Sequence, residues 1–229
     1  MFWRWIFVYN LSVCLSVISA GISPSSGPEC RDMGLFQCAR PIITFVMTAD
    51  GQRIGKIRKS GLLKENDFTK VCRLAQSTIS CIDGWIGRCM PANETDLHIV
   101  SKGTVKILSV CNETDSFSKF TKMTTCAEKI NNTHKACGES MRTNLPEAHK
   151  NINPRNPKEI FQIENLQRHV CCTIKQYKTC ITPSMQSSCA AEEKTLTDKF
   201  LDRVLGAYQC TNAVFGACVA EDGVATAKA

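Results

Sequence analysis

The chain contains few residues whose types and spacing could support catalysis. No G-x-S-x-G turn exposes a serine nucleophile, and no GxxxxGKS, GxxxxGKT or GxGxxG loop is present to bind phosphates. The histidines stand singly, without the HExxH spacing that places two zinc ligands on one helix face; they are His98, His134, His149 and His169. The sequence therefore predicts no acyl-transfer, metalloprotease or nucleotide-binding site, and neither a cofactor nor a metal ion.

Two adjacent cysteines, Cys171 and Cys172, also call for a chemical test. Small calcium-dependent secreted phospholipases carry such a doublet, followed by a catalytic histidine and aspartate. Here the next four residues are Thr, Ile, Lys and Gln, and no glycine-rich calcium loop precedes the doublet. Adjacent cysteines are poor partners for each other, because their Cα atoms lie about 3.8 Å apart. We therefore expect each of them to form a disulfide with a different cysteine.

Carboxylates are the remaining candidates for acid and base catalysis. Those that could pair are Glu192, Glu193, Asp198 and Asp202. They fall in or beside an amphipathic pattern over 195–208, where apolar residues recur at steps of three and four. We expect these carboxylates to lie on the solvated face of a helix, and the chain is predicted not to be an enzyme.

The N-terminus has the pattern of a signal peptide. One arginine, Arg4, precedes a short apolar stretch that ends in small residues at Ala20. This stretch is shorter than the roughly 20 apolar residues that a membrane-spanning helix needs. The pattern predicts cleavage after residue 20, and we expect no membrane anchor and a secreted, extracellular product.

Cysteine content agrees with secretion. The chain has 15 cysteines, and Cys14 lies within 1–20, so 14 remain and can pair completely. Because C-x-x-C pairs are absent, we expect disulfides and no metal site. The expected disulfide residues are Cys30, Cys38, Cys72, Cys81, Cys89, Cys111, Cys126, Cys137, Cys171, Cys172, Cys180, Cys189, Cys210 and Cys218.

One cysteine pattern occurs twice, at an offset of about 99 residues. The gaps from Cys38 to Cys111 are 34, 9, 8 and 22 residues, and those from Cys137 to Cys210 are 34, 9, 9 and 21. Cys30 and Cys126 complete two sets of six, for which 15 pairings each remain open. The pattern predicts two pseudo-repeats, over 21–115 and 116–220, with a flexible tail over 221–229. The two cysteines left over, at 172 and 218, are predicted to pair.

Hydrophobic periodicity predicts an all-α, disulfide-stabilised fold. The expected helices are 68–84, 97–110, 118–131, 160–178, 195–208 and 212–220. Three prolines and four asparagines between residues 144 and 158 predict a loop. The glycine-containing segment 49–60 is expected to turn or to be partly extended.

Two features of the sequence concern the surface. The sequons at Asn93, Asn112 and Asn131 are predicted glycosylation sites at turns or helix ends. The net charge of +7 falls to +6 without Arg4, and its densest stretch runs from Arg53 to Lys64. That stretch could attract sulfated glycans, although a solvated surface explains it as well.

The cysteine pattern resembles that of the secreted hemolymph glycoproteins of arthropods known as the twenty-seven-kilodalton class. The similar features are the signal peptide, the size and the succession of cysteines over 30–218, including Cys72, Cys81 and Cys89. Nematode chondroitin-proteoglycan modules and related cysteine-rich repeats use comparable spacings. The resemblance implies an extracellular helical glycoprotein and supplies no catalytic residues.

Together these observations predict a secreted extracellular or hemolymph binding or carrier protein. Its partner would be a protein, a glycan or an apolar small molecule held between helices, where Phe200 and Val204 could line the space. An ordinary filled core is the favoured explanation of these two residues. The alternative function is a matrix or secreted effector protein that binds polyanionic glycans or other proteins. No nucleic-acid partner is expected.

Overall fold

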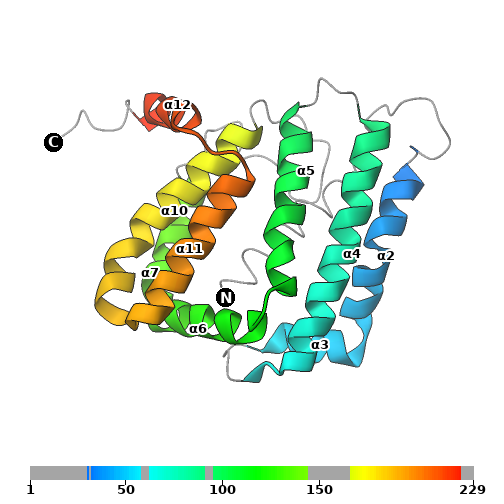
Figure 1. Cartoon of the computed structure of the whole chain (residues 1–229), viewed down its shortest axis with the longest axis horizontal. Helices are drawn as coiled ribbons and strands as arrows, with labels where there is room; N and C mark the ends of the chain where they lie inside the picture. Colours follow the sequence, from blue (N-terminus) through cyan, green and yellow to red (C-terminus); the bar gives the residue numbers. More distant parts are fainter. Residues whose placement is uncertain (1–29, 31, 58–61, 91–94, 144–165, 223–229) are drawn as a thin grey trace.

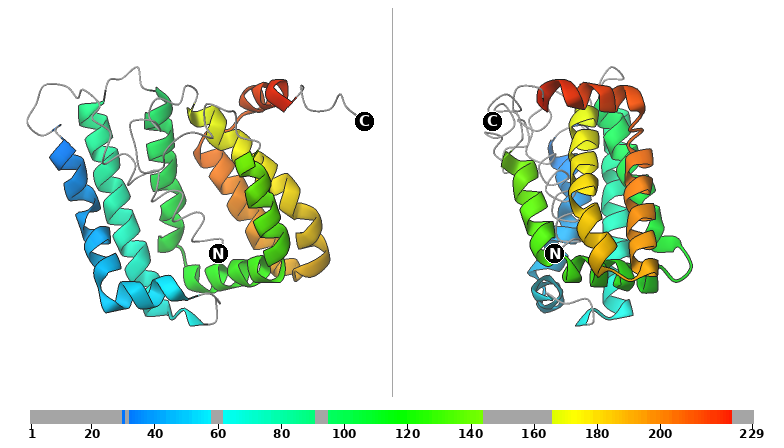
Figure 2. Two further views of the ribbon diagram at one scale, coloured as in Figure 1. Left: turned by 180° about the vertical axis from the view of Figure 1, so that it is seen from behind. Right: turned by 90° about the vertical axis from the view of Figure 1, so that its left-hand side faces the viewer.

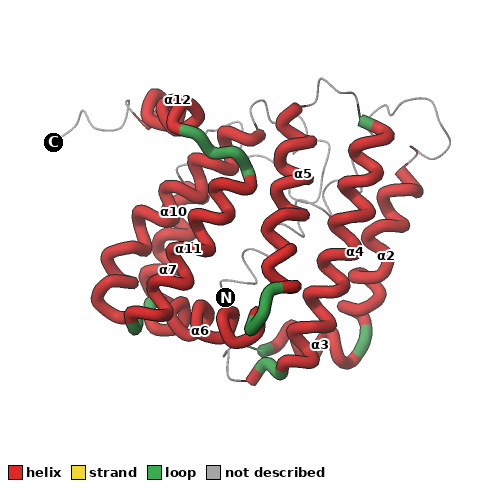
Figure 3. The backbone as a smooth tube through the Cα atoms, in the orientation of Figure 1, coloured by secondary structure: helices red, strands yellow, loops and turns green. Residues whose placement is uncertain are grey.

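The computed structural model describes residues 30, 32–57, 62–90, 95–143 and 166–222. Within these ranges every regular element is helical, and none of the described residues lies in a strand (Figure 3). The elements are α2 (Asp32–Met47), α3 (Ala49–Lys56), α4 (Glu65–Cys89), α5 (Thr95–Leu108), the 3₁₀ helix η3 (Ser109–Asn112), α6 (Ser116–Lys129), α7 (Asn131–Thr143), α10 (Leu166–Ser188), α11 (Ala191–Ala207) and α12 (Asn212–Asp222). The predicted all-α class is confirmed.

The long helices stand side by side in one body. Figure 1 shows α2, α4 and α5 as neighbours, followed by α11 and α10, with α7 behind them. Helices α3 and α6 run across one end of this row, and α12 crosses the other end (Figures 1 and 2). A single large cluster of buried apolar residues extends from Cys30 to Tyr208 and includes Ile86, Ile181 and Met185, each at most 1% exposed. Residues from both ends of the described chain therefore share this core.

Seven disulfides join the helices, and they pair all 14 expected cysteines. The bridges over 30–111 are Cys30–Cys89, Cys38–Cys81 and Cys72–Cys111. Those over 126–210 are Cys126–Cys189, Cys137–Cys180 and Cys171–Cys210. Within each set the first cysteine pairs with the fifth, the second with the fourth and the third with the sixth. The pairing of Cys172 with Cys218, 46 residues apart, follows the prediction and ties α12 to α10.

The order of the bridges fixes how the helices run. Cys30, just before α2, is bonded to Cys89 at the end of α4, and Cys38 within α2 is bonded to Cys81 within α4. Because the partner positions decrease as the chain advances, α2 and α4 are antiparallel. The second set has the same reversed order: Cys126 of α6 is bonded to Cys189, which follows α10, and Cys137 of α7 is bonded to Cys180 of α10.

The first and second sets of bridges meet at a seam between α5 and the pair α10 and α11. A Cβ atom added to Gly103 of α5 would lie 2.5 Å from Cδ1 of Tyr208 and 2.9 Å from the carbonyl oxygen of Ala207. Glycine is therefore needed here for close approach of two helices. The Tyr208 hydroxyl hydrogen-bonds Thr104 Oγ1 at 3.2 Å, and Gln167 Nε2 donates to the Tyr208 carbonyl at 2.9 Å.

Several predicted boundaries are wrong, and one predicted turn is a helix. Segment 49–56 forms α3, whose first turn is capped by Thr48 Oγ1 accepting from the Gly51 N–H at 3.1 Å. A Cβ atom at Gly51 would meet the Phe45 carbonyl oxygen at 2.1 Å, so this glycine serves the close corner between α2 and α3 and does not break the helix.

Other helices extend beyond their predicted ends. Helix α4 starts three residues before the predicted 68 and ends five residues after 84, and α10 continues from the predicted 178 to Ser188 through Pro183. Helices α2 and α7 are additional elements that the periodicity did not reveal. Four predicted segments lie outside the described residues: the predicted signal peptide 1–20, the predicted loop 144–158, residues 160–165 of the predicted helix 160–178, and 223–229 of the predicted tail.

Candidate functional site

The residues tested for catalysis occupy separate places in the fold. His134 of α7 is buried, and its Nδ1 atom lies 2.5 Å from the Tyr177 hydroxyl of α10. Burial lowers the pKa of His134 and raises the pKa of Tyr177. His98 and His169 are partly exposed on α5 and α10, and His149 lies outside the described ranges. Among the described residues, no three potential ligands gather at a metal-binding distance.

The four carboxylates lie on α11, and three of them form ion pairs. Glu193 is largely covered, with its side chain 13% exposed. Glu192 pairs with Lys122, Glu193 pairs with Lys129 at 2.7 Å, and Asp202 pairs with Lys178 at 2.5 Å. The backbone N–H of Ala190 also donates to Glu193 at 3.0 Å, which caps the start of α11. Although burial opposes it, the Lys129 ammonium and this N–H hold the pKa of Glu193 below its usual value.

Phe200 and Val204, considered above as the lining of a ligand space, are buried at 6% and 7% exposure. Both belong to the continuous core cluster. The side chains therefore pack the interior of the fold, and the filled-core interpretation accounts for them.

The basic segment has internal partners in its described part. The Arg53 guanidinium donates two hydrogen bonds to the Asp67 carboxylate, at 2.7 and 3.0 Å, and so joins α3 to α4. These bonds hold the pKa of Asp67 below its usual value. Asp50 binds Lys70 at 3.0 Å. Because Arg53 already binds a carboxylate, this segment presents less positive charge than its sequence indicates.

The three sequons differ in their surroundings. Asn93 lies outside the described residues. Asn112 is exposed at the end of η3, and its Oδ1 accepts a hydrogen bond from Gln76 Nε2 at 3.1 Å. Asn131 is half-buried and begins α7. Asn112 and Asn131 thus meet the expectation of a turn or helix end.

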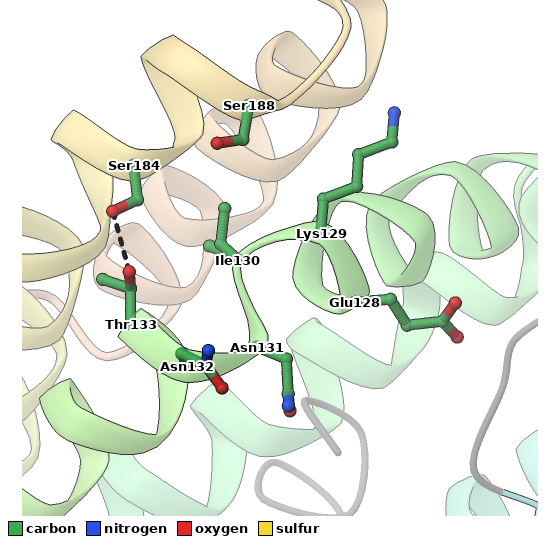
Figure 4. A pocket seen from close by; sticks show the side chains of 8 residues that line it. All are labelled: Glu128, Lys129, Ile130, Asn131, Asn132, Thr133, Ser184 and Ser188. Carbon is green, nitrogen blue, oxygen red and sulfur yellow. Dashed lines mark hydrogen bonds between the residues drawn. The ribbon is translucent and has the colours of Figure 1, made fainter.

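A polar hollow of about 420 Å³ lies at the corner between α6 and α7, against α10. Its lining includes Ile130, Asn131, Thr133, Ser184 and Ser188. Figure 4 shows Thr133 and Ser184 joined by a hydrogen bond of 2.8 Å, with Ile130 beside them. The side chain of Asn131, which also lines the hollow, is directed away from the two serines. Sequence reasoning found the Asn131 sequon but not the hollow, because the hollow depends on how α7 and α10 face each other.

One side chain that lines the hollow, that of Ser184, is small where the first set of helices has a large one. Ser184 follows Cys180 by four residues, as Trp85 follows Cys81. Thr133 precedes Cys137 by four residues, at the position that corresponds to Gly34. Trp85 is 5% exposed and fills its site, whereas Ser184 leaves space. The bridges Cys126–Cys189 and Cys137–Cys180 hold the walls, so the helices cannot close the gap.

The outer face of α2 is a second candidate site. Phe36 and Met47 are 46% and 74% exposed, and Ile43 lies between them on the same side of the helix. The spacing 36, 43, 47 places these side chains on one stripe. Arg40 is exposed in the middle of the stripe and has no carboxylate partner in the described structure. Together these four residues form what we call the α2 stripe.

The corresponding face at the other end of the molecule is polar. Residues 99 positions after Phe36 and Arg40 are Lys135 and Glu139, both exposed on α7. Cys38 of α2 and Cys137 of α7 hold these helices in the same register. The matched face of α7 is polar, so this fold does not require apolar residues at the positions of the α2 stripe.

Comparison with protein-family models, with curated proteins and with solved structures finds no match to this chain. These comparisons therefore do not identify the hemolymph glycoprotein class, and that resemblance stays a prediction. Across the ranges that the structure describes, no helix combines the length and apolar character needed to cross a bilayer.

Proposed function

We propose that this protein is a secreted, disulfide-bonded glycoprotein that acts as an extracellular binding protein without catalytic activity. Seven bridges among the 14 described cysteines support this, because such frameworks persist in oxidising compartments. The proposal includes a signal peptide over 1–20 and glycans on the sequons. A circulating role like that of the hemolymph glycoproteins is compatible with it.

The proposal also includes an origin from two pseudo-repeats. The shared pairing order of the two bridge sets supports this, and so does burial in α5 and α11. Buried positions in α5 recur in α11 100 residues later, as Leu97, Val100, Thr104 and Ile107 against Thr197, Phe200, Val204 and Ala207. In a pseudo-repeat, each helix face in one half can be compared with the corresponding helix face in the other half.

The observation that carries the binding function is the α2 stripe. Helix α2 contains only two charged residues, Asp32 and Arg40, and a helix that is apolar on most sides is ordinarily covered. Exposed apolar groups that form a contiguous patch indicate an interaction surface. In contrast, Phe200 and Val204 pack the core, which gives less support to an apolar cargo.

Arg40 determines which partner fits the α2 stripe. A second copy of this chain, docked through a two-fold axis near residues 41 and 42, would bring two Arg40 guanidinium groups together and would be disfavoured by like-charge repulsion. Membrane-surface helices carry several cations on their polar side, whereas α2 carries one. The stripe instead fits an amphipathic helix of another protein with an acidic residue opposite Arg40.

Binding can be tested with two synthetic amphipathic peptides of about 20 residues, long enough to form a helix. Both have leucines at steps of three and four, and they differ only in one central residue, glutamate or lysine. Fluorescence anisotropy should show tighter binding of the glutamate peptide by about tenfold, which corresponds to 1.4 kcal/mol. Arg40→Glu should reverse this preference, and Phe36→Lys with Met47→Lys should abolish binding of both peptides.

The matched control is Glu139→Arg on α7, which changes a charge at the corresponding position and should leave both affinities unchanged. Light scattering should show a monomer. The proposal is wrong if neither peptide binds, if Arg40→Glu leaves the preference unaltered, or if the protein is a dimer that Phe36→Lys dissociates.

A further inference from the structure

The polar hollow at the corner of α6 and α7 combines two properties of a small-molecule site. Its volume of about 420 Å³ falls within the range of ligand pockets, and two disulfides fix its walls before any ligand arrives. Such pre-organisation reduces the ordering that a bound group must undergo. The hollow is therefore suited to a ligand of modest size.

The lining indicates the chemistry of the ligand. Ser188 presents a hydroxyl group beside the hydrogen-bonded hydroxyls of Ser184 and Thr133, and Ile130 supplies an apolar side chain. Lys129 and Glu128 add one charge of each sign at the rim. Hydroxyl and amide groups can donate and accept hydrogen bonds, and an aliphatic side chain can pack against a sugar ring. These groups match a neutral carbohydrate better than an apolar compound.

A carbohydrate can also be attached covalently at this place. Asn131 lines the hollow, and it is the acceptor residue of the sequon completed by Thr133. In N-glycosylation the asparagine Nδ2 atom forms a bond to C1 of a sugar carried on a lipid diphosphate. The bond between C1 and the diphosphate oxygen breaks, and Nδ2 loses one proton. A sugar joined to Asn131 starts at a residue that lines the hollow, so binding requires no capture from solution, only a turn of the Asn131 side chain toward the serines.

We propose that the first sugar residues of a glycan on Asn131 lie in this hollow, in the place that corresponds to the indole of Trp85 in the first set of helices. The inference rests on the proposed secreted glycoprotein. It distinguishes Asn131 from Asn112, whose exposed side chain is held by Gln76 and does not line the hollow. A seated glycan is shielded from enzymes and packs the corner that Ser184 leaves open.

The experiment compares release of the two glycans by a peptide N-glycosidase, using the full chain secreted from eukaryotic cells. Glycopeptide mass spectrometry first measures occupancy at Asn131 and Asn112. In the native protein, release from Asn131 should be slower by about tenfold, because the sugar must leave the hollow before the enzyme can reach it; this factor corresponds to 1.4 kcal/mol. After reduction and denaturation, the two rates should be equal.

The decisive variant is Ser184→Trp, which places an indole where the first set of helices has one. It should expel the sugar and raise native release at Asn131 to the rate at Asn112, whereas Ser184→Ala should keep the protection. Circular dichroism and the mass of the oxidised protein check that each variant folds. The comparison of native and denatured wild-type protein does not depend on either variant.

Each outcome has a separate meaning. An unmodified Asn131 beside a modified Asn112 overturns the inference and leaves the glycoprotein proposal standing. Equal native release from both sites, or protection that Ser184→Trp does not remove, also overturns it. A secreted protein with no glycan on any sequon contradicts the glycoprotein proposal itself, and the peptide-binding experiment tests the α2 stripe independently.

Discussion

Helices α4 and α10 occupy matching places in the two sets of bridges, yet they differ in whether their buried polar side chains have hydrogen-bond partners. Thr78 of α4 is 2% exposed, and its Oγ1 atom has no hydrogen-bond partner in the described structure. The position 99 residues later is Tyr177, whose hydroxyl hydrogen-bonds His134. The residue 99 positions before His134 is a leucine, a residue type without a hydrogen-bonding side chain.

A second matched position repeats the contrast. The Nε1 atom of Trp85 is buried without a partner in the described structure, whereas Ser184 hydrogen-bonds Thr133. Gly34 occupies the position that corresponds to Thr133 and has no side-chain acceptor.

The contrast shows two ways of completing the same framework. Helix α4 has ten buried residues against seven in α10, so the first set gains apolar packing and tolerates unsatisfied polar atoms. Each such atom costs about 1–3 kcal/mol. The second set satisfies its polar groups but encloses less volume, which leaves the hollow. Differences at matched positions thus mark where the two sets of helices differ in packing.

The largest effect should come from removing one bridge from each set. The pairs Cys72–Cys111 and Cys171–Cys210 both enclose 39 residues, so loop entropy predicts the same loss for each, about 4 kcal/mol. Cys72→Ala with Cys111→Ala and Cys171→Ala with Cys210→Ala should therefore lower the free energy of unfolding equally in urea titrations. A difference above about 1 kcal/mol would show that native packing, and not the unfolded chain, decides the value of a bridge.

The seam between the two sets of bridges depends on Gly103. Gly103→Ala should destabilise the protein by about 2 kcal/mol, because the new Cβ atom meets the backbone of Ala207 as well as the Tyr208 ring. Thermal unfolding measures the loss. Gly206→Ala in α11 has open space around its Cβ and should be neutral or stabilising by up to about 1 kcal/mol. Similar effects of both changes would contradict a tight seam at Gly103.

Matched substitutions at Thr78 and Tyr177 sharpen the polar contrast. Thr78→Val removes a buried hydroxyl that has no partner in the described structure and should stabilise the protein by about 1 kcal/mol. Tyr177→Phe removes a hydroxyl that binds His134 and should destabilise it by about 1 kcal/mol. Chemical unfolding gives both values, and the same sign for both would remove the distinction between the two sets of helices.

Between pH 7 and 5, we expect a pH dependence of stability from His134 in the second set of helices. Burial lowers the pKa of His134 from its usual 6.5, so the unfolded chain takes up a proton before the folded protein does. The contribution of neutral His134 to the free energy of unfolding is complete above pH 6.5. It is lost as the pH falls below that value toward the pKa of His134 in the folded protein. His134→Gln should flatten the decrease in unfolding free energy between pH 7 and 5, whereas the control His98→Gln should retain it. The lowered pKa values of Asp67 and Glu193 act at lower pH, below their usual 3.8 and 4.5.

The sequence predicted the features that depend on periodic spacing. The all-α class, the six helices at their approximate positions, the 14 bridged cysteines and the Cys172–Cys218 pair are confirmed, because cysteine gaps and amphipathic stripes are local properties of the chain. The boundaries were less accurate. Helix α10 continues through Pro183, where tertiary packing of Met185 outweighs a residue that ordinarily ends a helix.

The missed elements have identifiable physical reasons. Helix α2 is apolar on most sides and contains Pro41 and a β-branched run, so its 3.6-residue period is weak. Helix α7 is mostly polar, and α3 contains two glycines. The polar hollow and the α2 stripe could not be predicted, because both depend on which positions of different helices face each other. The bridges determine which positions face each other, and their pairing was not known from the sequence.

All seven bridges lie on one side or the other of residues 112–125, and none of the 14 cysteines joins the two sides. Resistance to proteases should therefore depend strongly on where the chain is cut. A nick between residues 143 and 166 leaves fragments that Cys126–Cys189 and Cys137–Cys180 still connect, so the protein migrates as one band until it is reduced. A nick within 112–125 leaves two fragments joined only by the noncovalent seam, and a denaturing gel separates them without reductant. A single cleavage in this short stretch would divide the chain into two pieces that each keep their own bridges.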